Sequence, residues 1–429
     1  MRKYKLLIAA SVFIAVALVI CLVVAAVFSS LARRQKPAAF DDADLIFTRP
    51  QVPVESNAFL TLLQATNELY WPTAKDSQLR DLSDNTNWDD ALAAELLEKN
   101  HACLDLFDAA AQQPFLLIPE PGTFDEAYPY LADWRAISRV KSIQANAWFR
   151  GHKEKEAFDS ALGLVKFGQQ AENSGGPIIH YLVGAAIKTS GLLRIQQMAA
   201  QTTLKETDLL GLVRELDGFK PNKEGLTNAL KVEYQLDCRL LDDYARGKIS
   251  TMNSNSDRTM MAIGIKPIFN ATKTKMEFAR LIRVIRDGNS KPYGEIPWSD
   301  MPGMETNRSM LKRVIKGNII GDILFELLEP SIQSLSKRKS REDVSVTATQ
   351  LLLALKIYKM RHDQLPESLS ELVPEFFSQV PLDDFDGKPF RYLPGKKLIY
   401  SIGPDLKDSG GAAMQKGSKE YDLPFPIEF

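Results

Sequence analysis

The hydrophobic pattern of the chain begins with a stretch from Leu6 to Phe28 that contains no charged residue. This stretch is long enough to cross ~30 Å of hydrocarbon at ~1.5 Å per residue. A charge inside the hydrocarbon is costly, so basic residues mark where such a span ends. They stand on both sides of the stretch, at Arg2, Lys3, Lys5, Arg33, Arg34 and Lys36. The pattern predicts a transmembrane anchor within residues 1–36.

A cleavable signal peptide is the alternative interpretation, with a small-residue cleavage site at Ser30–Ala32. The apolar run exceeds the ~7–15 residues of an ordinary signal peptide, which favours an uncleaved anchor. Both flanks are basic, and the free amino terminus adds one positive charge on the N-terminal side. We therefore expect a single-pass cell-membrane protein whose body faces the non-cytoplasmic, periplasmic or extracytoplasmic side.

Helical periodicity dominates the chain after a proline-containing linker at residues 37–56. Apolar residues recur at helical spacing through residues 57–337, and Gly, Pro, Asn or Ser separate the periodic segments. Asp89 is a candidate N-cap, with Asp90 at the positive end of the helix dipole. The expected helices are 57–70, 89–107, 130–150, 153–173, 178–200, 205–216, 223–246, 259–287 and 318–336.

The segment from Tyr130 to Gln170 indicates an antiparallel helix pair, because small residues line both helices and Gly151 separates them. The pair resembles a tetratricopeptide unit, but no second copy follows at a ~34-residue period. The helical domain could therefore be either a bundle or a solenoid-like body. Ile178 to Leu193 is strongly apolar, yet Lys188 interrupts it, which favours a buried core helix over a second span.

The pattern changes after residues 337–341, and residues 342–429 are expected to form a small α/β module. An amphipathic helix at 342–361 ends before Pro366, and an acidic turn follows at Pro381–Gly387. Two short strands, 390–392 and 398–400, are expected on either side of Pro394-Gly395. The sequence therefore predicts a mainly α protein with four parts: anchor 1–36, linker 37–56, helical domain 57–337 and module 342–429.

The runs ALKIYKMRHDQLPESLSELV, VPLDDFDGKPFRYL and LIYSIGPDLKDSGG occur in this order within the module. Together they resemble the C-terminal domain of the major pseudopilin of type II secretion systems, over about residues 342–422. The resemblance implies an antiparallel sheet packed on a helix. The chain departs from the family at Asp386, which separates Phe385 from Gly387. The apolar N-terminal run lacks the glycine and glutamate of pilin precursors, so processing by a prepilin peptidase is not expected.

The resemblance also implies a calcium-binding loop. Calcium takes six to eight oxygen ligands from carboxylates and carbonyls. The candidate ligands are the carboxylates of Asp405, Asp408 and Asp422, the Ile402 carbonyl and the Ser401 hydroxyl. The spacing from Gly411 to Asp422 differs from the family pattern. The alternative is a solvated acidic turn in which Gly and Asp permit tight backbone geometry.

Composition narrows the function without naming one. A net charge of -1 and the absence of a basic patch argue against nucleic-acid binding. The four histidines match no zinc motif. Cys103 and Cys238 could pair in an oxidising compartment or remain buried thiols. Cys21 falls within the apolar run.

No nucleophile or phosphate-binding motif is present, and no enzymatic activity is expected. Adjacent carboxylates such as Asp383–Asp384 are poor acid–base pairs, because neighbouring side chains do not face each other on a helix. We expect a membrane-anchored envelope protein that acts as an interaction or scaffold component, associated with a type II secretion or pilus-like system. A helical ligand-binding module outside the membrane and an unrecognised hydrolase are the alternatives.

Overall fold

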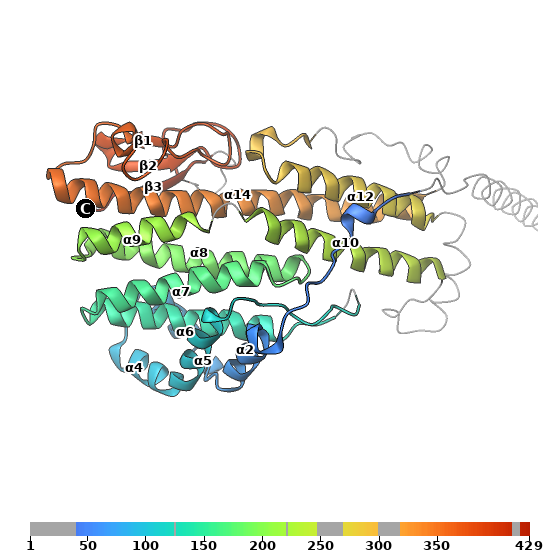
Figure 1. Ribbon diagram of the computed structural model, residues 1–429, viewed down its shortest axis with the longest axis horizontal. Helices are drawn as coiled ribbons and strands as arrows, with labels where there is room; N and C mark the ends of the chain where they lie inside the picture. Colours follow the sequence, from blue (N-terminus) through green and yellow to red (C-terminus); the bar gives the residue numbers. More distant parts are fainter. Residues whose placement is uncertain (1–39, 124–125, 220–221, 247–268, 299–317, 414–420) are drawn as a thin grey trace, which may run out of the picture. The chain divides into compact units, whose positions relative to one another are not determined.

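The computed structural model describes residues 40–123, 126–219, 222–246, 269–298, 318–413 and 421–429 (Figure 1). The predicted anchor within residues 1–36 and the first part of the helix expected at 259–287 lie outside these residues. The described chain is mainly helical with one small antiparallel sheet, as expected. Its α-helices are α2 (Ala58–Asn67), α3 (Asp76–Ser83), α4 (Asp90–Lys99), α5 (His101–Gln112), α6 (Tyr130–Arg150), α7 (Glu154–Glu172), α8 (Ile178–Gln201), α9 (Glu206–Asp217), α10 (Lys223–Arg246), α12 (Ala271–Gly288) and α14 (Ile319–His362).

Contacts divide the chain into two compact units. The smaller unit contains Met1–Ile46, Tyr234–Val284 and Trp298–Gln333, and the larger unit contains Phe47–Glu233, Ile285–Pro297 and Ser334–Phe429. The sheet, the loop that carries Asp405 and Asp408, and most of the helices belong to the larger unit. Cys103 in the larger unit and Cys238 in the smaller one are both free.

Close packing of α7 against α8 forms the centre of the larger unit (Figure 1). Three glycines allow this approach. A Cβ atom at Gly168 would lie 2.6 Å from the Lys188 Cβ, and one at Gly184 would lie 2.6 Å from the Glu172 nitrogen. A Cβ atom at Gly191 would lie 2.6 Å from the carbonyl oxygen of Ala161. The predicted helix pair is α6 and α7, and α7 also packs tightly against α8.

Among the described residues, α8 is the one helix long and apolar enough to cross a membrane. Most of its apolar window, 61%, is buried inside the protein. His180, Lys188 and Arg194 on this helix are all buried. The helix is therefore a core element here, as Lys188 indicated.

A buried ion cluster joins α7, α8 and α14. Lys188 Nζ lies 2.5 Å from Glu342 Oε1 and 3.5 Å from Glu172 Oε2, and it donates hydrogen bonds to Gln169 Oε1 at 2.6 Å and to the Phe219 carbonyl at 2.9 Å. Asn222 donates to Glu172. Burial and the charge of Glu342 raise the pKa of Glu172 well above its usual range. The cluster fixes α14 against the core.

Several helix boundaries differ from the expected ones, and α3 was not expected. The predicted helix at 89–107 is divided at Asn100, whose side chain accepts a hydrogen bond from the Tyr70 nitrogen and donates to the Tyr70 carbonyl. The Asp89 side chain caps α4 as predicted, by accepting from the Leu92 nitrogen at 3.0 Å. The segments 318–336 and 342–361 form one continuous helix, α14, which passes through the predicted boundary at 337–342. That residues 342–429 form a module separate from the helical domain stays a prediction.

The sheet consists of β1 (Arg391–Leu393), β2 (Leu398–Ser401) and β3 (Leu423–Pro426) in the order β1-β2-β3. The β1–β2 hairpin is the predicted one, with Arg391 opposite Tyr400. β3 was not predicted, because Pro424 and Pro426 argue against a strand interior. Here they lie in a strand that pairs with β2 and forms an end of the described sheet, where proline is tolerated.

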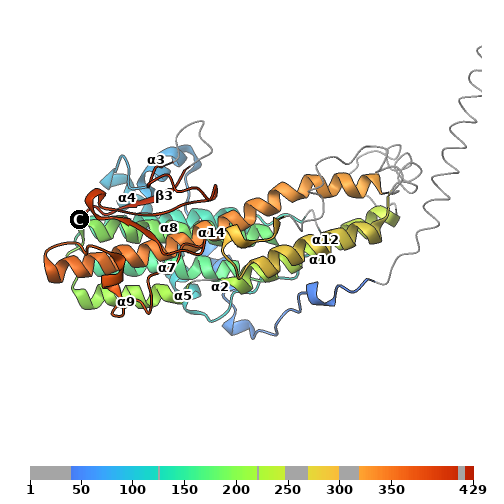
Figure 2. The same cartoon turned by 90° about the horizontal axis from the view of Figure 1, so that it is seen from above.

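The chain end runs beside the C-terminal half of α14 (Figure 2). Lys356 on α14 lies 5.0 Å from the ring centre of Phe429, and Arg341 lies 5.7 Å from that of Tyr421. Tyr392 on β1 donates to the carbonyl of Pro366 at 2.9 Å. Helix and sheet therefore pack together within the larger unit.

In the smaller unit, α12 and the start of α14 approach closely. The buried Asn318 side chain accepts from the Asn270 nitrogen at 2.8 Å and contacts Thr274. A Cβ atom at Gly321 would collide with Thr274 Oγ1. The glycine thus serves a close helix crossing.

Candidate functional site

The acidic turn at 381–387 carries two adjacent aspartates whose side chains have different partners. Asp383 is fully buried and Asp384 is partly exposed. Asp383 contacts Ser401 at the end of β2 and Ile402 after it. Asp384 contacts Lys339 of α14 and lines a cavity. The turn therefore connects two candidate sites.

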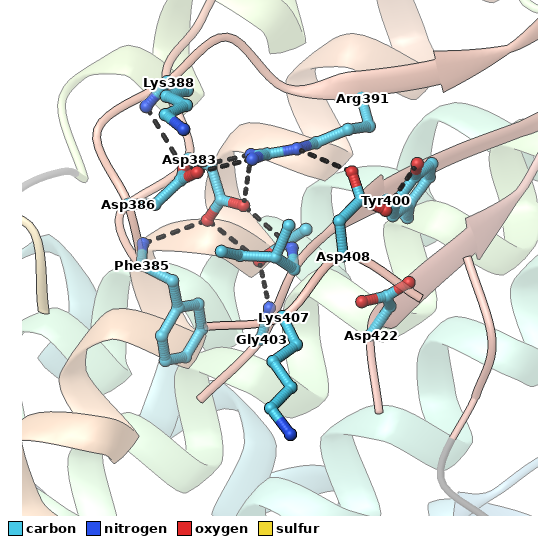
Figure 3. A network of polar contacts seen from close by, with 12 residues as sticks. Asp383, Phe385, Asp386, Lys388, Arg391, Tyr400, Gly403, Lys407, Asp408 and Asp422 are labelled. Atoms are coloured by element: carbon cyan, nitrogen blue, oxygen red, sulfur yellow. Dashed lines mark hydrogen bonds and ion pairs between the residues drawn. The ribbon is translucent and has the colours of Figure 1, made fainter. Parts of the chain in front are cut away.

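Asp383 is the centre of a hydrogen-bond network (Figure 3). Its Oδ1 accepts from the Ser401 hydroxyl at 2.8 Å and from the Phe385 nitrogen at 3.0 Å. Its Oδ2 accepts from the Ile402 nitrogen at 2.9 Å and from Arg391 Nη1 at 3.1 Å. Burial raises the pKa of this carboxyl, although the hydrogen bonds oppose the rise. Ser401 and Ile402, both predicted calcium ligands, are thus held by a carboxylate that the prediction did not include.

Arg391 extends the network to Asp386 and Asp408 (Figure 3). Its Nη1 lies 3.0 Å from Asp386 Oδ1, and its Nε lies 3.8 Å from Asp408 Oδ2. Burial alone would raise the pKa of Asp386, but the hydrogen bond from Arg391 holds it below the usual value. Asp386, the residue that departs from the pseudopilin pattern, therefore has a defined partner.

The three predicted aspartates gather around one loop, where each accepts hydrogen bonds from backbone amides. Asp405 accepts from the Tyr421 nitrogen at 2.9 Å, and Asp408 accepts from the Gly410 nitrogen at 3.0 Å. Asp422 Oδ2 accepts from the Gly411 nitrogen at 2.7 Å. Burial, together with the charges of Asp408 and Asp405, raises the pKa of Asp422.

The oxygen-only donor set suits calcium in its chemistry. The geometry suits it in part, because the Ser401 hydroxyl already donates to Asp383 and accepts from the Gly403 nitrogen. Within the described part of the chain, no group of three or more His, Cys, Asp or Glu residues lies close enough to hold a metal. The calcium site stays a prediction.

A cavity of about 910 Å³ lies between α9, α14 and residues 375–384. The α14 residues Asp343, Thr347 and Gln350 line it, and all three are buried. Their spacing of four and three residues places them on one helix face. They form the cavity floor. The aromatic rings of Phe376 and Phe377, half-buried, also line it.

Charged residues of mixed sign line the cavity where it is exposed. Arg214 and Asp217 come from α9, Lys223 begins α10, and Glu375 follows α14. Glu375 is already paired, because its carboxylate contacts Arg361. The exposed rim thus carries both signs of charge.

Lys339 links the cavity floor to the acidic turn. Its Nζ lies 2.8 Å from Asp343 Oδ2 and 3.1 Å from Asp384 Oδ2. Burial and the charge of Asp343 raise the pKa of Asp384 to about 6, against the opposing effect of Lys339. Two carboxylates thus share one ammonium group.

Sequence reasoning noted the Asp383–Asp384 pair but not this arrangement. The two side chains have different partners, Ser401 for Asp383 and Lys339 for Asp384. Asp384 shares Lys339 with Asp343, which is distant in sequence. The only sequence signal for it was the change of pattern around residues 337–342.

Comparison with known proteins found no matching family model, no matching curated protein and no matching solved structure. The cavity and the loop must therefore be interpreted from their own chemistry.

Proposed function

We propose that this chain is a membrane-tethered ligand-binding protein of the cell envelope, with its ligand in the cavity over α9 and α14. One observation carries the proposal. The cavity has the volume of a small-molecule site, about 910 Å³, and combines apolar walls with a few buried polar groups. Buried polar groups normally have hydrogen-bond partners. Gln350 Oε1 on the floor has none among the described residues, so a ligand would supply one.

Filling the cavity tests this proposal. Leu210 lines the cavity from α9, so Leu210→Trp adds bulk there. We would screen a library of small polar compounds against the full-length chain in detergent and record melting midpoints. A compound that binds only the folded chain stabilises it by ~2.7 kcal/mol at a hundredfold excess over its Kd. Compounds that raise the wild-type midpoint should lose this effect in Leu210→Trp.

Gly211→Ala is the matched control, because a Cβ atom at Gly211 meets nothing within 4 Å. Every compound that raises the melting midpoint of the wild type should also raise that of Gly211→Ala. If no compound raises the wild-type midpoint, or if Leu210→Trp responds as the wild type does, the cavity is not a ligand site.

The membrane tether is the second part of the proposal, and the uncharged run Leu6–Phe28 supports it. A reporter that is active only outside the cytoplasm, fused after Phe429, should be active. Deletion of residues 1–36 should release the chain from the membrane. Activity of a cytoplasm-specific reporter at the same position would contradict the orientation.

Assembly with a type II secretion or pilus-like system is a second candidate function. The antiparallel sheet lies beside α14 (Figure 1), which is the arrangement that the pseudopilin resemblance implies, and it supports this candidate. Leu406, an exposed apolar residue of the loop, is a suitable position for a photo-crosslinker. An adduct with a pilin-like subunit would support the assembly role. Adducts with no such subunit would count against it.

A further inference from the structure

We propose that the cavity recognises an ammonium group carried on a short alkyl stem, such as a free amine or a lysine side chain. The inference rests on the proposed ligand-binding function and names the chemistry of its ligand. It follows from the buried polar atoms of the floor, from the charge balance there and from the aromatic wall.

The buried polar atoms of the floor are hydrogen-bond acceptors. Gln350 is 1% exposed, and its Nε2 donates to the Val213 carbonyl at 3.0 Å. This leaves Oε1, which has no partner among the described residues, as an acceptor at the cavity. Asp343 Oδ2, in contrast, already has the Lys339 ammonium group 2.8 Å away. A ligand group that satisfies Gln350 Oε1 must donate a hydrogen bond.

The charge balance selects a cation. Asp343 and Asp384 carry two negative charges when ionised, and Lys339 supplies one positive charge. One negative charge remains where the acidic turn meets the floor. Burial is the largest cause of the raised pKa of Asp384, and the charge of Asp343 adds to it. An ammonium ion of the ligand would neutralise the remaining charge.

The walls suit an alkyl stem. Phe376 and Phe377 present aromatic surface to the cavity, and Leu210 adds aliphatic surface. An alkyl chain buries apolar area against such walls, and an ammonium group near an aromatic face gains a further cation–π attraction. An anionic ligand head at the floor would instead meet the excess carboxylate.

Three probes that differ mainly in their head groups test the inference. They are Nα-acetyl-lysine amide, Nα-acetyl-glutamine amide and Nα-acetyl-glutamate amide, with cationic, neutral and anionic ends. Binding to the full-length protein is measured by saturation-transfer NMR. Probes of this size should bind with Kd in the millimolar range. We expect the lysine probe to bind at least about tenfold more tightly than the other two, because a hydrogen-bonded charge pair is worth this factor or more.

Three substitutions test whether the preference for the lysine probe comes from the floor and the acidic turn. Asp384→Asn keeps the shape of the side chain, removes the excess charge and should abolish the tenfold preference. Glu375→Gln removes a lining charge that Arg361 already pairs, and should keep the preference. Gln350→Met, with unchanged melting behaviour as the check on folding, should weaken the lysine and glutamine probes, whose ends donate hydrogen bonds, and leave the glutamate probe unchanged.

A further probe distinguishes the two possible sources of the ammonium group, a free amine and a lysine side chain. Binding of 1,5-diaminopentane as tight as that of the lysine probe indicates a free amine, and much weaker binding indicates a peptide side chain. Equal binding of the three head groups, a preference for the glutamate probe, or no binding of the lysine probe would overturn the inference. The proposed function would survive these results if other compounds still lost their binding in Leu210→Trp.

Discussion

Lys188 is a buried cation in the core of the larger unit. Its side chain is 0% exposed and pairs with two buried carboxylates. In Lys188→Met the charge of Glu342 would stay buried without its counter-ion. Breaking a buried pair from one side typically costs ~3–5 kcal/mol. We expect a loss of that order in the free energy of unfolding, measured by urea denaturation.

Lys166→Met is the matched control for this prediction. Lys166 pairs with Glu215 at 2.6 Å, but both side chains are more than a third exposed. Exposed pairs contribute ~0–1 kcal/mol, so this variant should be close to the wild type. Similar losses in the two variants would show that the buried cluster has no special role.

His180 predicts a pH dependence of stability. It is buried among aromatic rings, its Nε2 lies 2.8 Å from the Tyr130 hydroxyl, and burial lowers its pKa to about 4. In the unfolded chain the pKa is ~6.5. Between these values the unfolded chain binds a proton that the folded chain does not. The free energy of unfolding should therefore fall on acidification from pH 6.5 to 4, by up to about 3 kcal/mol.

Comparison with His180→Gln isolates this contribution, because glutamine keeps a polar nitrogen near Tyr130 but does not titrate. Urea denaturation of both proteins at a series of pH values measures it. The difference between the two should change over pH 4–6.5 and be constant above pH 7.5. A constant difference throughout would mean that His180 titrates alike in the folded and unfolded chains.

At the scale of elements, glycine positions on α7 and α8 set the helix spacing. A Cβ atom at Gly184 would lie 2.6 Å from the Glu172 nitrogen and 2.7 Å from the Gly168 carbonyl. Both are backbone atoms and cannot move alone, so Gly184→Ala must separate the helices. Overpacking of this kind costs ~1–3 kcal/mol.

Gly211→Ala on α9 should stabilise the protein, in contrast to Gly184→Ala. Nothing lies within 4 Å of its added Cβ, so helix propensity decides the outcome. Alanine is favoured over glycine in a helix interior by ~0.8–1.0 kcal/mol. Melting midpoints should therefore fall for Gly184→Ala and rise for Gly211→Ala. A rise for both would contradict the tight crossing.

Sequence patterns predicted local elements far better than the contacts between them. The amphipathic stripes and the Gly151 turn placed α6 to α10 within a few residues of their observed bounds. Asn100 divided a predicted helix because its side chain bonds to Tyr70, which is remote in sequence. β3 escaped prediction because its prolines are tolerated only by its place in the sheet. Local periodicity carries no information on such tertiary partners.

The same limit applies to the candidate sites. The resemblance brought Asp405, Asp408 and Asp422 to attention, and they do lie around one loop. The network centred on Asp383 was missed, because a buried aspartate looks like any other acid of an acidic turn. The cavity was also missed. Its floor residues Asp343, Thr347 and Gln350 are ordinary positions of an amphipathic helix until α9 is packed beside them.

For the whole molecule, calcium binding is testable by thermal melting. A metal that binds only the folded chain at a hundredfold excess over its Kd adds ~2.7 kcal/mol. For a unit of this size, that amounts to a rise of several degrees in the midpoint of the larger unit. We compare the full-length chain in excess calcium and in chelator. Asp405→Asn with Asp408→Asn should abolish the rise, and equal wild-type midpoints would leave the loop a plain acidic turn.

The central claim is that the cavity holds a ligand in the cell. The most direct measurement is to extract the full-length chain gently from its own membranes, denature it and compare the released small molecules by mass spectrometry. The account predicts a compound released by the wild type and by Gly211→Ala but absent from Leu210→Trp. Release of the same compounds, in the same amounts, from the wild type and Leu210→Trp would contradict it.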